Sequence, residues 1–312
     1  MRAVGLDEFG GPEVLRVVEL PRPEAGPGQI GIRVHAAGVT PGDVLLRSGR
    51  IAALMEGVRQ PYLPGQEVAG VVDQIGAGTA TDLRIGDRVM AMVVPIRPDG
   101  GGYAEHVVLD ANWVGRAPAG TSHAEAATLP MNGLTARMAL DQLDLPPGAT
   151  LAVTGAAGAV GGFVVQLAKQ AGLTVYADAK ASDVPRVSAL GADQVVVRGP
   201  GVADRFRELA PGGVDGAVDT VGTADLFDAI RDGGGLAWVS GGSAEAPRGI
   251  KAGYVYMPDY GGRPDELDEL RRLAETGVLT LRVADTFPPE QAGQAHRLLE
   301  AGGVRGRLVI AF

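Results

Sequence analysis

The segment at residues 151–161 constrains the fold most, because it reads as a strand, a glycine turn and a helix in succession. Leu151–Thr154 is short and apolar, as a buried strand is. Gly158 would let the backbone approach a pyrophosphate, and Gly161 would let the helix pack closely on the strand. The helix N-terminus would offer N–H groups to the anion. The segment therefore predicts a dinucleotide-binding turn, with Ala156 in place of the first glycine of the usual pattern; a glycine turn without a ligand is the alternative.

Three charged residues beyond the turn bear on the choice of dinucleotide. Asp178 lies 20 residues after Gly158, where an acid would bind the ribose hydroxyls of NAD. Lys180 follows two residues later and Arg198 comes just after the next strand, where a base would bind the 2′-phosphate of NADP. Two cations against one acid favour NADP(H) over NAD(H). A solvated loop is the alternative for all three residues.

The apolar pattern divides the chain into two kinds of structure. Up to about residue 121, short alternating strands are separated by glycine, proline and aspartate turns, which is typical of a small barrel or sandwich. From there, apolar strands alternate with helical segments, which predicts an α/β fold with a doubly wound parallel sheet. After residue 263 the pattern is helix, strand, helix, strand, and we expect the last strands to return to the first domain.

Composition and charge exclude several classes of function. The chain has no cysteine, so it forms no disulfide and offers no thiolate to zinc, and its four histidines lack metal-ligand spacing. A net charge of −9 argues against a nucleic-acid surface. No apolar run approaches the ~18 residues of a membrane helix. An acid appears too early at the start for a signal peptide. We therefore expect a cytoplasmic protein without nucleic-acid, membrane or metal partners.

Nine short segments follow one another in an order that is specific when taken together. They are Gly38–Asp43, Pro64–Val72, Gly86–Val89, Gly102–Glu105, Asn132–Ala136, Ala156–Gly161, Leu190–Asp193, Asp219–Gly222 and Arg305–Val309. With them the chain resembles the medium-chain dehydrogenase/reductase superfamily, in the zinc-free quinone oxidoreductase (zeta-crystallin-like) branch. The resemblance implies a GroES-like β-barrel domain over residues 1–121 and 280–312 and a Rossmann cofactor-binding domain over 122–279. It also implies hydride transfer from NAD(P)H in the interdomain cleft and a dimer or tetramer, of which we expect a homodimer.

The resemblance also bears on metal chemistry. Zinc-dependent members carry a metal-binding cysteine and histidine at the positions of Thr40 and Gln66, so we expect no zinc here. Reduction of electron-poor acceptors, such as quinones or α,β-unsaturated carbonyls, remains, since hydrogen bonds can stabilise the charge that builds on a conjugated oxygen. The branch often has Asn at the position of Thr40 and Tyr at that of Leu45. We therefore expect a less polar entry, which favours a larger apolar acceptor or an enone.

The resemblance implies contacts between the cofactor and the turn, the loops after later strands, and one helix. The implied cofactor-binding residues are Thr135, Ala157, Gly158, Ala159, Val160, Gly161, Asp178, Lys180, Arg198, Val221, Ser240, Gly241, Val255, Tyr256 and Arg307. Thr135 could instead bond its own helix backbone. The sequence identifies no general acid: Thr40 and Tyr62 are candidates, and packing is the usual role of a residue such as Tyr62.

Three functions therefore stay open at this point. The first is an NADPH-dependent, zinc-independent reductase of a quinone or another conjugated small-molecule acceptor. The second is an enone or enoyl C=C reductase of a biosynthetic pathway, for which Arg47, Arg50 and Arg59 could form a basic patch toward an acyl thioester. The third is an NADPH-binding structural or sensor protein without turnover.

Overall fold

The computed structural model describes residues 1–241, 245–257 and 262–312, and the chain divides into two compact units. Unit 1 contains Met1–Met131, Gly261–Thr276 and Leu281–Phe312, and unit 2 contains Asn132–Tyr260 and Gly277–Thr280. The first boundary thus lies at residue 131, where we had expected 121. No helix in the described part of the chain combines the length and apolarity that crossing a membrane requires.

Helix α7 (Pro264–Glu275) belongs to unit 1, although the domain bounds implied by the resemblance placed it in the cofactor-binding domain. The reason is packing and hydrogen bonding. The Leu267 side chain lies so close to Gly115 that a Cβ there would be 3.1 Å from the leucine Cβ. Glu275 accepts a hydrogen bond of 2.8 Å from the Ala119 N–H. These partners lie some 150 residues earlier in the chain, so no local pattern reveals them.

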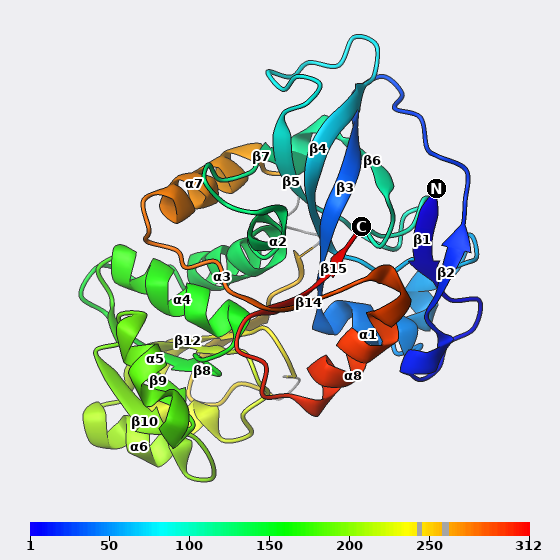
Figure 1. Ribbon diagram of the computed structural model, residues 1–312. Coiled ribbons are helices and arrows are strands. Elements are labelled where there is room, and N and C mark those ends of the chain that lie inside the picture. Colours follow the sequence, from blue (N-terminus) through cyan, green and yellow to red (C-terminus); the bar gives the residue numbers. More distant parts are fainter. Residues whose placement is uncertain (242–244, 258–261) are drawn as a thin grey trace. The chain divides into compact units, whose positions relative to one another are not determined.

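Unit 1 is built on a β-sheet with mostly antiparallel neighbours (Figure 1). Its strand order is β14 (Val283–Phe287), β15 (Arg307–Ala311), β3 (Gln29–Val39), β4 (Glu67–Ile75), β5 (Arg88–Met92) and β7 (Val114–Arg116), and β6 (His106–Asp110) also pairs with β3. A separate antiparallel pair consists of β1 (Arg2–Gly5) and β2 (Arg16–Glu19). The helices are α1 (Pro41–Arg47), α2 (His123–Ala126), α7 and α8 (Ala292–Ala301). Short 3₁₀ turns occupy Pro12–Val14, Ala52–Met55, Ala111–Trp113 and Pro289–Gln291.

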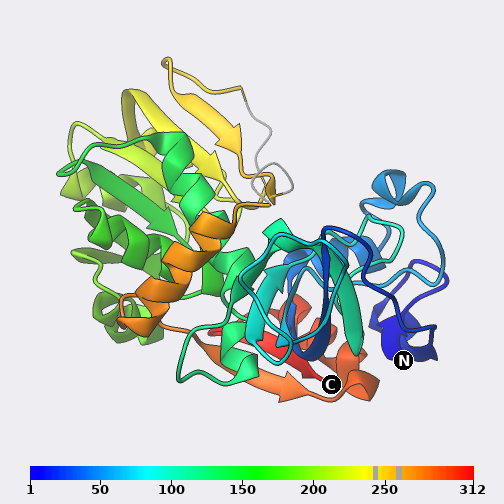
Figure 2. The same cartoon turned by 90° about the horizontal axis from the view of Figure 1, so that it is seen from above.

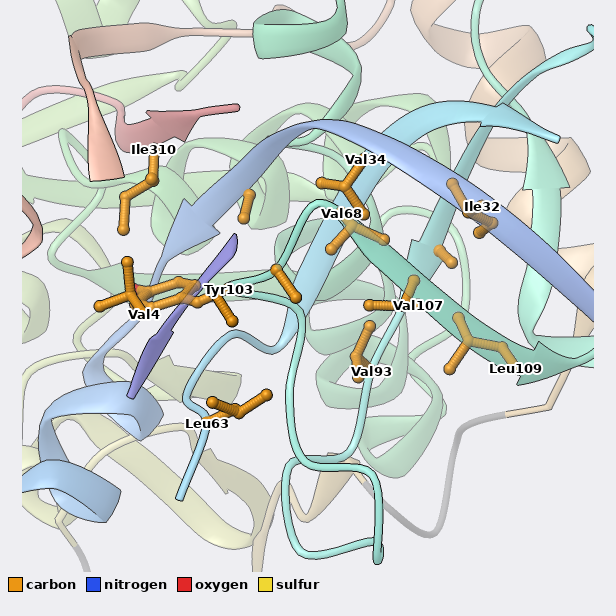
Figure 3. Packing of buried hydrophobic residues seen from close by; sticks show 14 of the residues in the cluster. Val4, Ile32, Val34, Leu63, Val68, Val93, Tyr103, Val107, Leu109 and Ile310 are labelled. Carbon is orange, nitrogen blue, oxygen red and sulfur yellow. The ribbon is translucent and has the colours of Figure 1, made fainter. Parts of the chain in front are cut away.

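The core of unit 1 follows from alternation along its strands. Ile32 and Val34 of β3 point to the same side as Val68 of β4 and Val107 of β6, and Figure 3 shows these side chains gathered in one core. All four are nearly or fully buried, and each such side chain contributes roughly 1.5–3 kcal/mol when it leaves water. This core fixes the loops and helices that carry the polar groups described below.

Unit 2 is an α/β domain with a parallel sheet, which confirms the predicted fold class. The strand order is β10 (Gln194–Val197), β9 (Thr174–Ala179), β8 (Thr150–Thr154), β11 (Val214–Asp219), β12 (Ile230–Trp238) and β13 (Lys251–Tyr254). Its helices are α3 (Pro130–Leu143), which begins at the unit boundary, α4 (Ala159–Gln170), α5 (Val184–Ala189) and α6 (Val202–Leu209), with 3₁₀ turns at Ala181–Asp183 and Leu226–Ala229. The first strand, β8, lies inside the sheet, and β13 (gold in Figure 2) lies at one edge.

The position of β8 determines where a ligand can bind. The chain proceeds from β8 to β9 and β10 on one side of the sheet, and then to β11, β12 and β13 on the other. All six strands run in the same direction, so their carboxyl ends lie along one edge. In open α/β sheets, ligands bind outside the carboxyl ends where the strand order reverses. Here that point is the end of β8, which leads directly into the glycine turn.

Candidate functional site

The turn after β8 has the geometry of an anion-binding loop. Gly155 has a φ of +68°, and its carbonyl accepts the Gly158 N–H at 2.9 Å. Gly158 is the N-cap of α4, and no described side chain caps this end of the helix. A Cβ on Gly161 would lie 2.4 Å from the Gly155 carbonyl oxygen, so α4 approaches the turn as closely as only glycine allows. The turn therefore presents the first-turn N–H groups of α4, including those of Ala159 and Val160.

A buried carboxylate supports the turn from β9. Asp178 is only 2% exposed, and its Oδ1 accepts a hydrogen bond of 2.6 Å from the Gly155 N–H. Burial raises the pKa of Asp178, while the Gly155 hydrogen bond and the charge of Arg198 oppose the rise. We expected this carboxylate to face a ribose. The structure instead places it beneath the turn, where it accepts from the backbone and has almost no exposed surface.

A second buried carboxylate supports the loop on the other side of β8. Asp219 ends β11 and is fully buried, and it accepts the N–H groups of Val221 at 3.0 Å, Gly222 at 3.1 Å and Thr223 at 2.6 Å. It also accepts the Thr154 hydroxyl at 2.6 Å, which links this loop to the last residue of β8. The glycine turn and the loop after β11 are thus each held by one aspartate.

Two cations lie at the ends of the paired strands β9 and β10. Lys180 follows β9 and is exposed, and the Arg198 N–H donates to the Ala179 carbonyl at 2.8 Å just after β10. The Arg198 Nε lies 3.9 Å from Asp178 Oδ2, yet the side chain is 42% exposed. The structure therefore places both predicted cations beside the turn, and Arg198 is oriented in part by the acid beneath it.

The remaining predicted residues of unit 2 lie at the same sheet edge or behind it. Val221, Ser240 and Gly241 belong to the loops after β11 and β12, which touch: a Cβ on Gly241 would lie 3.0 Å from the Gly222 Cα. Val255 is buried and donates its N–H to the Trp238 carbonyl at 2.8 Å, whereas Tyr256 is 40% exposed. Thr135 and Ala157 are buried in α3 and in the turn.

A polar cluster in unit 1 surrounds the start of α1. Thr40 is the N-cap, and its Oγ1 lies 2.8 Å from Asp43 Oδ2 and 2.6 Å from Gln66 Oε1. The other carboxylate oxygen, Asp43 Oδ1, accepts the Gly65 N–H at 2.7 Å. A Cβ on Gly42 would lie 2.0 Å from Gln66 Oε1, so the amide occupies space that only a glycine leaves open. Gln66 was not among the residues expected to form the site, because its contact with Thr40, 26 residues earlier, leaves no local signal in the sequence.

A further set of buried groups lies behind Asp43. The Tyr103 hydroxyl lies 3.3 Å from Asp43 Oδ2 and 3.2 Å from His296 Nε2. Burial raises the pKa of Asp43 to about 6, and it raises the pKa of Tyr103 well above its ordinary value. Burial, with a smaller effect from Arg47, lowers the pKa of His296 to about 3. At neutral pH the phenol and the imidazole are therefore uncharged, and Asp43 is the member of this set that can titrate.

Two predictions for unit 1 need correction, and Tyr62 has the packing role that the sequence analysis gave as the usual one. Arg307 was expected to contact the cofactor, but its Nε lies 2.6 Å from Glu67 Oε1, and both side chains are buried. Arg47 was considered for an exposed basic patch, but it is 1% exposed and pairs with Glu300 at 2.6 Å. Tyr62 stacks on Phe9 with ring centroids 5.2 Å apart, which is a packing role.

The donor groups do not fit zinc. Zinc in proteins prefers thiolate, imidazole and carboxylate ligands, whereas Thr40 and Gln66 offer a hydroxyl and an amide. Across residues 1–241, 245–257 and 262–312, no group of three or more histidine and acidic side chains could hold a metal ion.

Two family models match the chain in the order of its sequence. One, described as "Alcohol dehydrogenase GroES-like domain", matches residues 26–119, and one described as "Zinc-binding dehydrogenase" matches residues 190–310. A quinone oxidoreductase of Pseudomonas aeruginosa is 31% identical, and the match covers 97% of each chain. An NADPH-dependent alkenal/one oxidoreductase of Arabidopsis thaliana is 29% identical over 99% of this chain and 79% of that protein.

Other relatives match over only part of their own length. A chloroplastic quinone oxidoreductase of Triphysaria versicolor is 36% identical over 63% of this chain, and the match spans 60% of that protein. A pikromycin polyketide synthase component of Streptomyces venezuelae is 33% identical over 92% of this chain, and the match spans 8% of that protein. The chain therefore spans only part of the length of these two relatives.

Solved structures show the same fold over the whole chain. An NAD-dependent alcohol dehydrogenase superposes with a TM-score of 0.88 at 30% identity, and a mycobacterial protein in complex with NADPH with a TM-score of 0.88 at 28% identity. Both matches cover 100% of each chain. The fold, the ordered motifs and the full-length relatives show that the chain belongs to the medium-chain dehydrogenase/reductase superfamily, in its quinone oxidoreductase-like branch, and is an oxidoreductase of a family that binds a nicotinamide cofactor.

Proposed function

We propose that the protein uses NADPH, without zinc, to reduce a quinone or another electron-poor conjugated acceptor. The observation that carries the choice of cofactor is the arrangement of charges beside the turn. Lys180 and Arg198 lie at the ends of neighbouring strands and keep exposed surface, as groups that bind a 2′-phosphate must. Asp178, which would favour NAD if it faced the ribose, is buried and accepts the Gly155 N–H. This arrangement supports NADPH over NADH.

The chemistry proposed for the chain is binding and polarisation. Bound NADPH supplies a hydride, and with one proton from solvent it converts a quinone to a hydroquinone or an enone to a saturated carbonyl, leaving NADP⁺. The N–H groups at the start of α4 would hold the pyrophosphate. In unit 1, the Gln66 amide is half-buried and its Nε2 has no hydrogen-bond partner among the described residues. Such a donor can stabilise the negative charge that builds on the acceptor oxygen.

A C=C reductase of a biosynthetic pathway is the second candidate. The observation in its favour is the half-buried leucine at position 45, on α1, where members of the branch often carry tyrosine. An apolar side chain there suits a larger apolar enone better than a small quinone. The alkenal/one oxidoreductase relative supports the same choice. Because Arg47 is buried, the basic patch for an acyl thioester would lack one of its three arginines.

A homodimer in the cytoplasm remains part of the proposal. β13 is an edge strand of the parallel sheet, and its Lys251, Ala252 and Tyr254 are exposed. An exposed edge strand presents unpaired N–H and C=O groups that a second copy can pair with. The edge therefore supports dimerisation through β13.

The cofactor part of the proposal is tested by titration. Binding of NADPH and of NADH is measured by nucleotide fluorescence for the wild type, Lys180→Ala and Arg198→Gln. Each substitution should weaken NADPH binding by about 10–100-fold, because a charged hydrogen bond contributes ~1.5–3 kcal/mol, and should change NADH binding little. Lys251→Ala, a lysine of unit 2 on the edge strand, is the matched control. Equal losses for both nucleotides would contradict the assignment.

The acceptor part is tested by following NADPH oxidation with short quinones and with bulky enones. Turnover with quinones supports the first candidate, and turnover with enones alone supports the second. Tight NADPH binding without turnover of any conjugated acceptor would contradict both and favour a structural or sensor protein.

A further inference from the structure

Three oxygen atoms in unit 1 lie in a row at hydrogen-bond distances and form a short chain. The positions of the protons among them determine which group donates each hydrogen bond and which group accepts it. Thr40 Oγ1 lies 2.8 Å from Asp43 Oδ2 and 2.6 Å from Gln66 Oε1. Both are hydrogen-bond distances. A hydroxyl carries only one proton, and neither a carboxylate oxygen nor an amide oxygen carries any. Two hydrogen bonds along this chain therefore need a second proton, and the Asp43 carboxyl is the group that can hold it.

Two arrangements satisfy the chain, and they differ in what Gln66 presents outward. When Asp43 is protonated, it donates to Thr40 Oγ1, the Thr40 hydroxyl donates to Gln66 Oε1, and the Gln66 N–H groups face outward. When Asp43 is ionised, the Thr40 hydroxyl donates to Asp43 Oδ2. The Gln66 amide must then turn over so that its Nε2 donates to Thr40, and its oxygen faces outward.

The surroundings of Gln66 limit the amide to these two orientations. Its terminal group lies against Gly42, where a Cβ would be 2.0 Å from Oε1 and 2.7 Å from Nε2. The Gln66 carbonyl accepts the Val93 N–H at 2.8 Å, which fixes the backbone at the edge of β4. The outward atom of the amide has no partner among the described residues, so a ligand can use it.

We propose that Asp43 is a positioning residue: its protonated carboxyl turns the Thr40 hydroxyl toward Gln66 and so presents the Gln66 N–H to the oxygen of the acceptor. This inference rests on the proposed reduction of a conjugated acceptor and extends it by naming the donor and the group that orients it. No proton passes from Asp43 to the product, because the proton that the reaction consumes comes from solvent. A carboxylate at position 43 would instead present an amide oxygen, which repels the oxygen of the acceptor.

Several titratable or charged groups face Asp43. They are Tyr103 and His296 behind it, Glu67 on β4, Arg307 on β15, and Arg47 at the end of α1. Burial raises the pKa of Asp43 to about 6 against the backbone hydrogen bonds from Gly65 and Thr40 and the charge of Arg307. Glu67 and Arg307 form an ion pair of 2.6 Å, and Arg47 pairs with Glu300.

The first test observes the amide directly and needs no turnover. The protein is labelled with ¹⁵N-glutamine, and the Gln66 side-chain amide signals, assigned by their loss in Gln66→Met, are followed from pH 5 to pH 8. We expect one step near pH 6 in the wild type and none in Asp43→Asn, whose amide can donate to Thr40 at every pH. Thr40→Val, which has the same shape without a hydroxyl, should also abolish the step.

The second test measures turnover with a quinone or an enone at saturating NADPH, since the 2′-phosphate itself titrates near pH 6. Wild-type kcat/KM for the acceptor should fall about tenfold per pH unit above pH 6, to a limit of ~10²–10³-fold for the loss of one oxyanion donor. Asp43→Asn should keep the low-pH value across the range. Thr40→Val and Gln66→Met should be slow at every pH. Asp82→Asn, an exposed acid of the same unit, is the matched control and should follow the wild type.

The outcomes separate this inference from the proposed function. A wild type that turns over acceptors while its Gln66 signals show no step, or an Asp43→Asn variant with the wild-type fall in rate, would overturn the role of Asp43 and leave the reductase intact. If no conjugated acceptor is reduced, the proposed function fails. The amide titration then still decides whether Asp43 orients Gln66.

Discussion

Replacing Arg307 by methionine removes the cation that compensates a fully buried carboxylate. Arg307 Nε lies 2.6 Å from Glu67 Oε1, and the side chains of the two residues are 6% and 0% exposed. The second Glu67 oxygen accepts the Met131 N–H at 2.9 Å, so the acid also holds the start of α3. Breaking a buried pair by removing one partner costs ~3–5 kcal/mol, because the remaining charge is left without compensation. We therefore expect Arg307→Met to lower the free energy of unfolding of unit 1 by about that amount.

The loss should depend on pH in a definite direction. Burial raises the pKa of Glu67, and the charge of Arg307 opposes that rise, so the variant has a still higher pKa in the folded state. A group whose pKa is raised on folding favours the folded state at low pH, and that contribution is lost as pH rises through the folded-state value. The difference between variant and wild type should therefore be smaller at pH 5 than at pH 8.

Thermal unfolding followed by circular dichroism at the two pH values measures this difference. For domains of ~150–250 residues, 1 kcal/mol corresponds to roughly 2–4 °C, so we expect a decrease in Tm of about 6–20 °C at pH 8. Glu67→Gln/Arg307→Met should recover most of the decrease, because no charge remains buried. A decrease under 2 °C, or one that is equal at both pH values, would refute the reasoning. If the variant instead kept its stability and lost only affinity for NADPH, the result would support the contact between Arg307 and the cofactor that was expected from the sequence.

Three further predictions concern unit 2. Asp178→Ala leaves the Gly155 N–H without its acceptor, which costs ~1–3 kcal/mol, so fluorescence titration should show NADPH and NADH affinities falling together; a loss confined to NADH would indicate a ribose contact instead. Gly161→Ala places a Cβ 2.4 Å from the Gly155 carbonyl oxygen, so calorimetry should show a lower Tm and weaker stabilisation by NADPH, at a cost of ~1–3 kcal/mol for overpacking; an unchanged Tm would contradict the close approach. Ala252→Lys puts a charge on the exposed edge strand β13, so sedimentation should show a dimeric wild type and a monomeric variant; a monomeric wild type would contradict pairing through β13.

The features that the sequence predicted correctly are those encoded by neighbouring residues. The parallel α/β sheet follows from strands that alternate with helices. The glycine turn is recognised from Gly155, Gly158 and Gly161, and the last two lie close to the Gly155 carbonyl oxygen within the same seven residues. The family follows from short motifs in a fixed order. In each case the physical cause and the sequence signal occupy the same stretch of chain.

The features that the sequence predicted wrongly depend on partners far along the chain. Arg307 pairs with Glu67, 240 residues earlier, and a motif that places an arginine near the C-terminus does not say which acid it meets. Arg47 is buried because Glu300 on α8 faces it. Helix α7 belongs to unit 1 because it packs on β7. The sequence shows that amphipathic or charged residues such as these need a partner, but it does not identify that partner.

Asp178 shows why the acid after the second strand of a Rossmann domain is an ambiguous signal. The same position can present a carboxylate to a ribose or turn it under the glycine turn, and here Oδ1 accepts the Gly155 N–H while the side chain is buried. Asp219 likewise accepts backbone N–H groups of the loop after β11. In unit 1, Asp43 accepts the Gly65 N–H, and Glu67 accepts the Met131 N–H. An unpaired buried carboxylate is costly, and each of these acids instead accepts a hydrogen bond from a loop or the start of a helix. The burial of Asp178 therefore favours a role in supporting the glycine turn over a direct contact with a ribose.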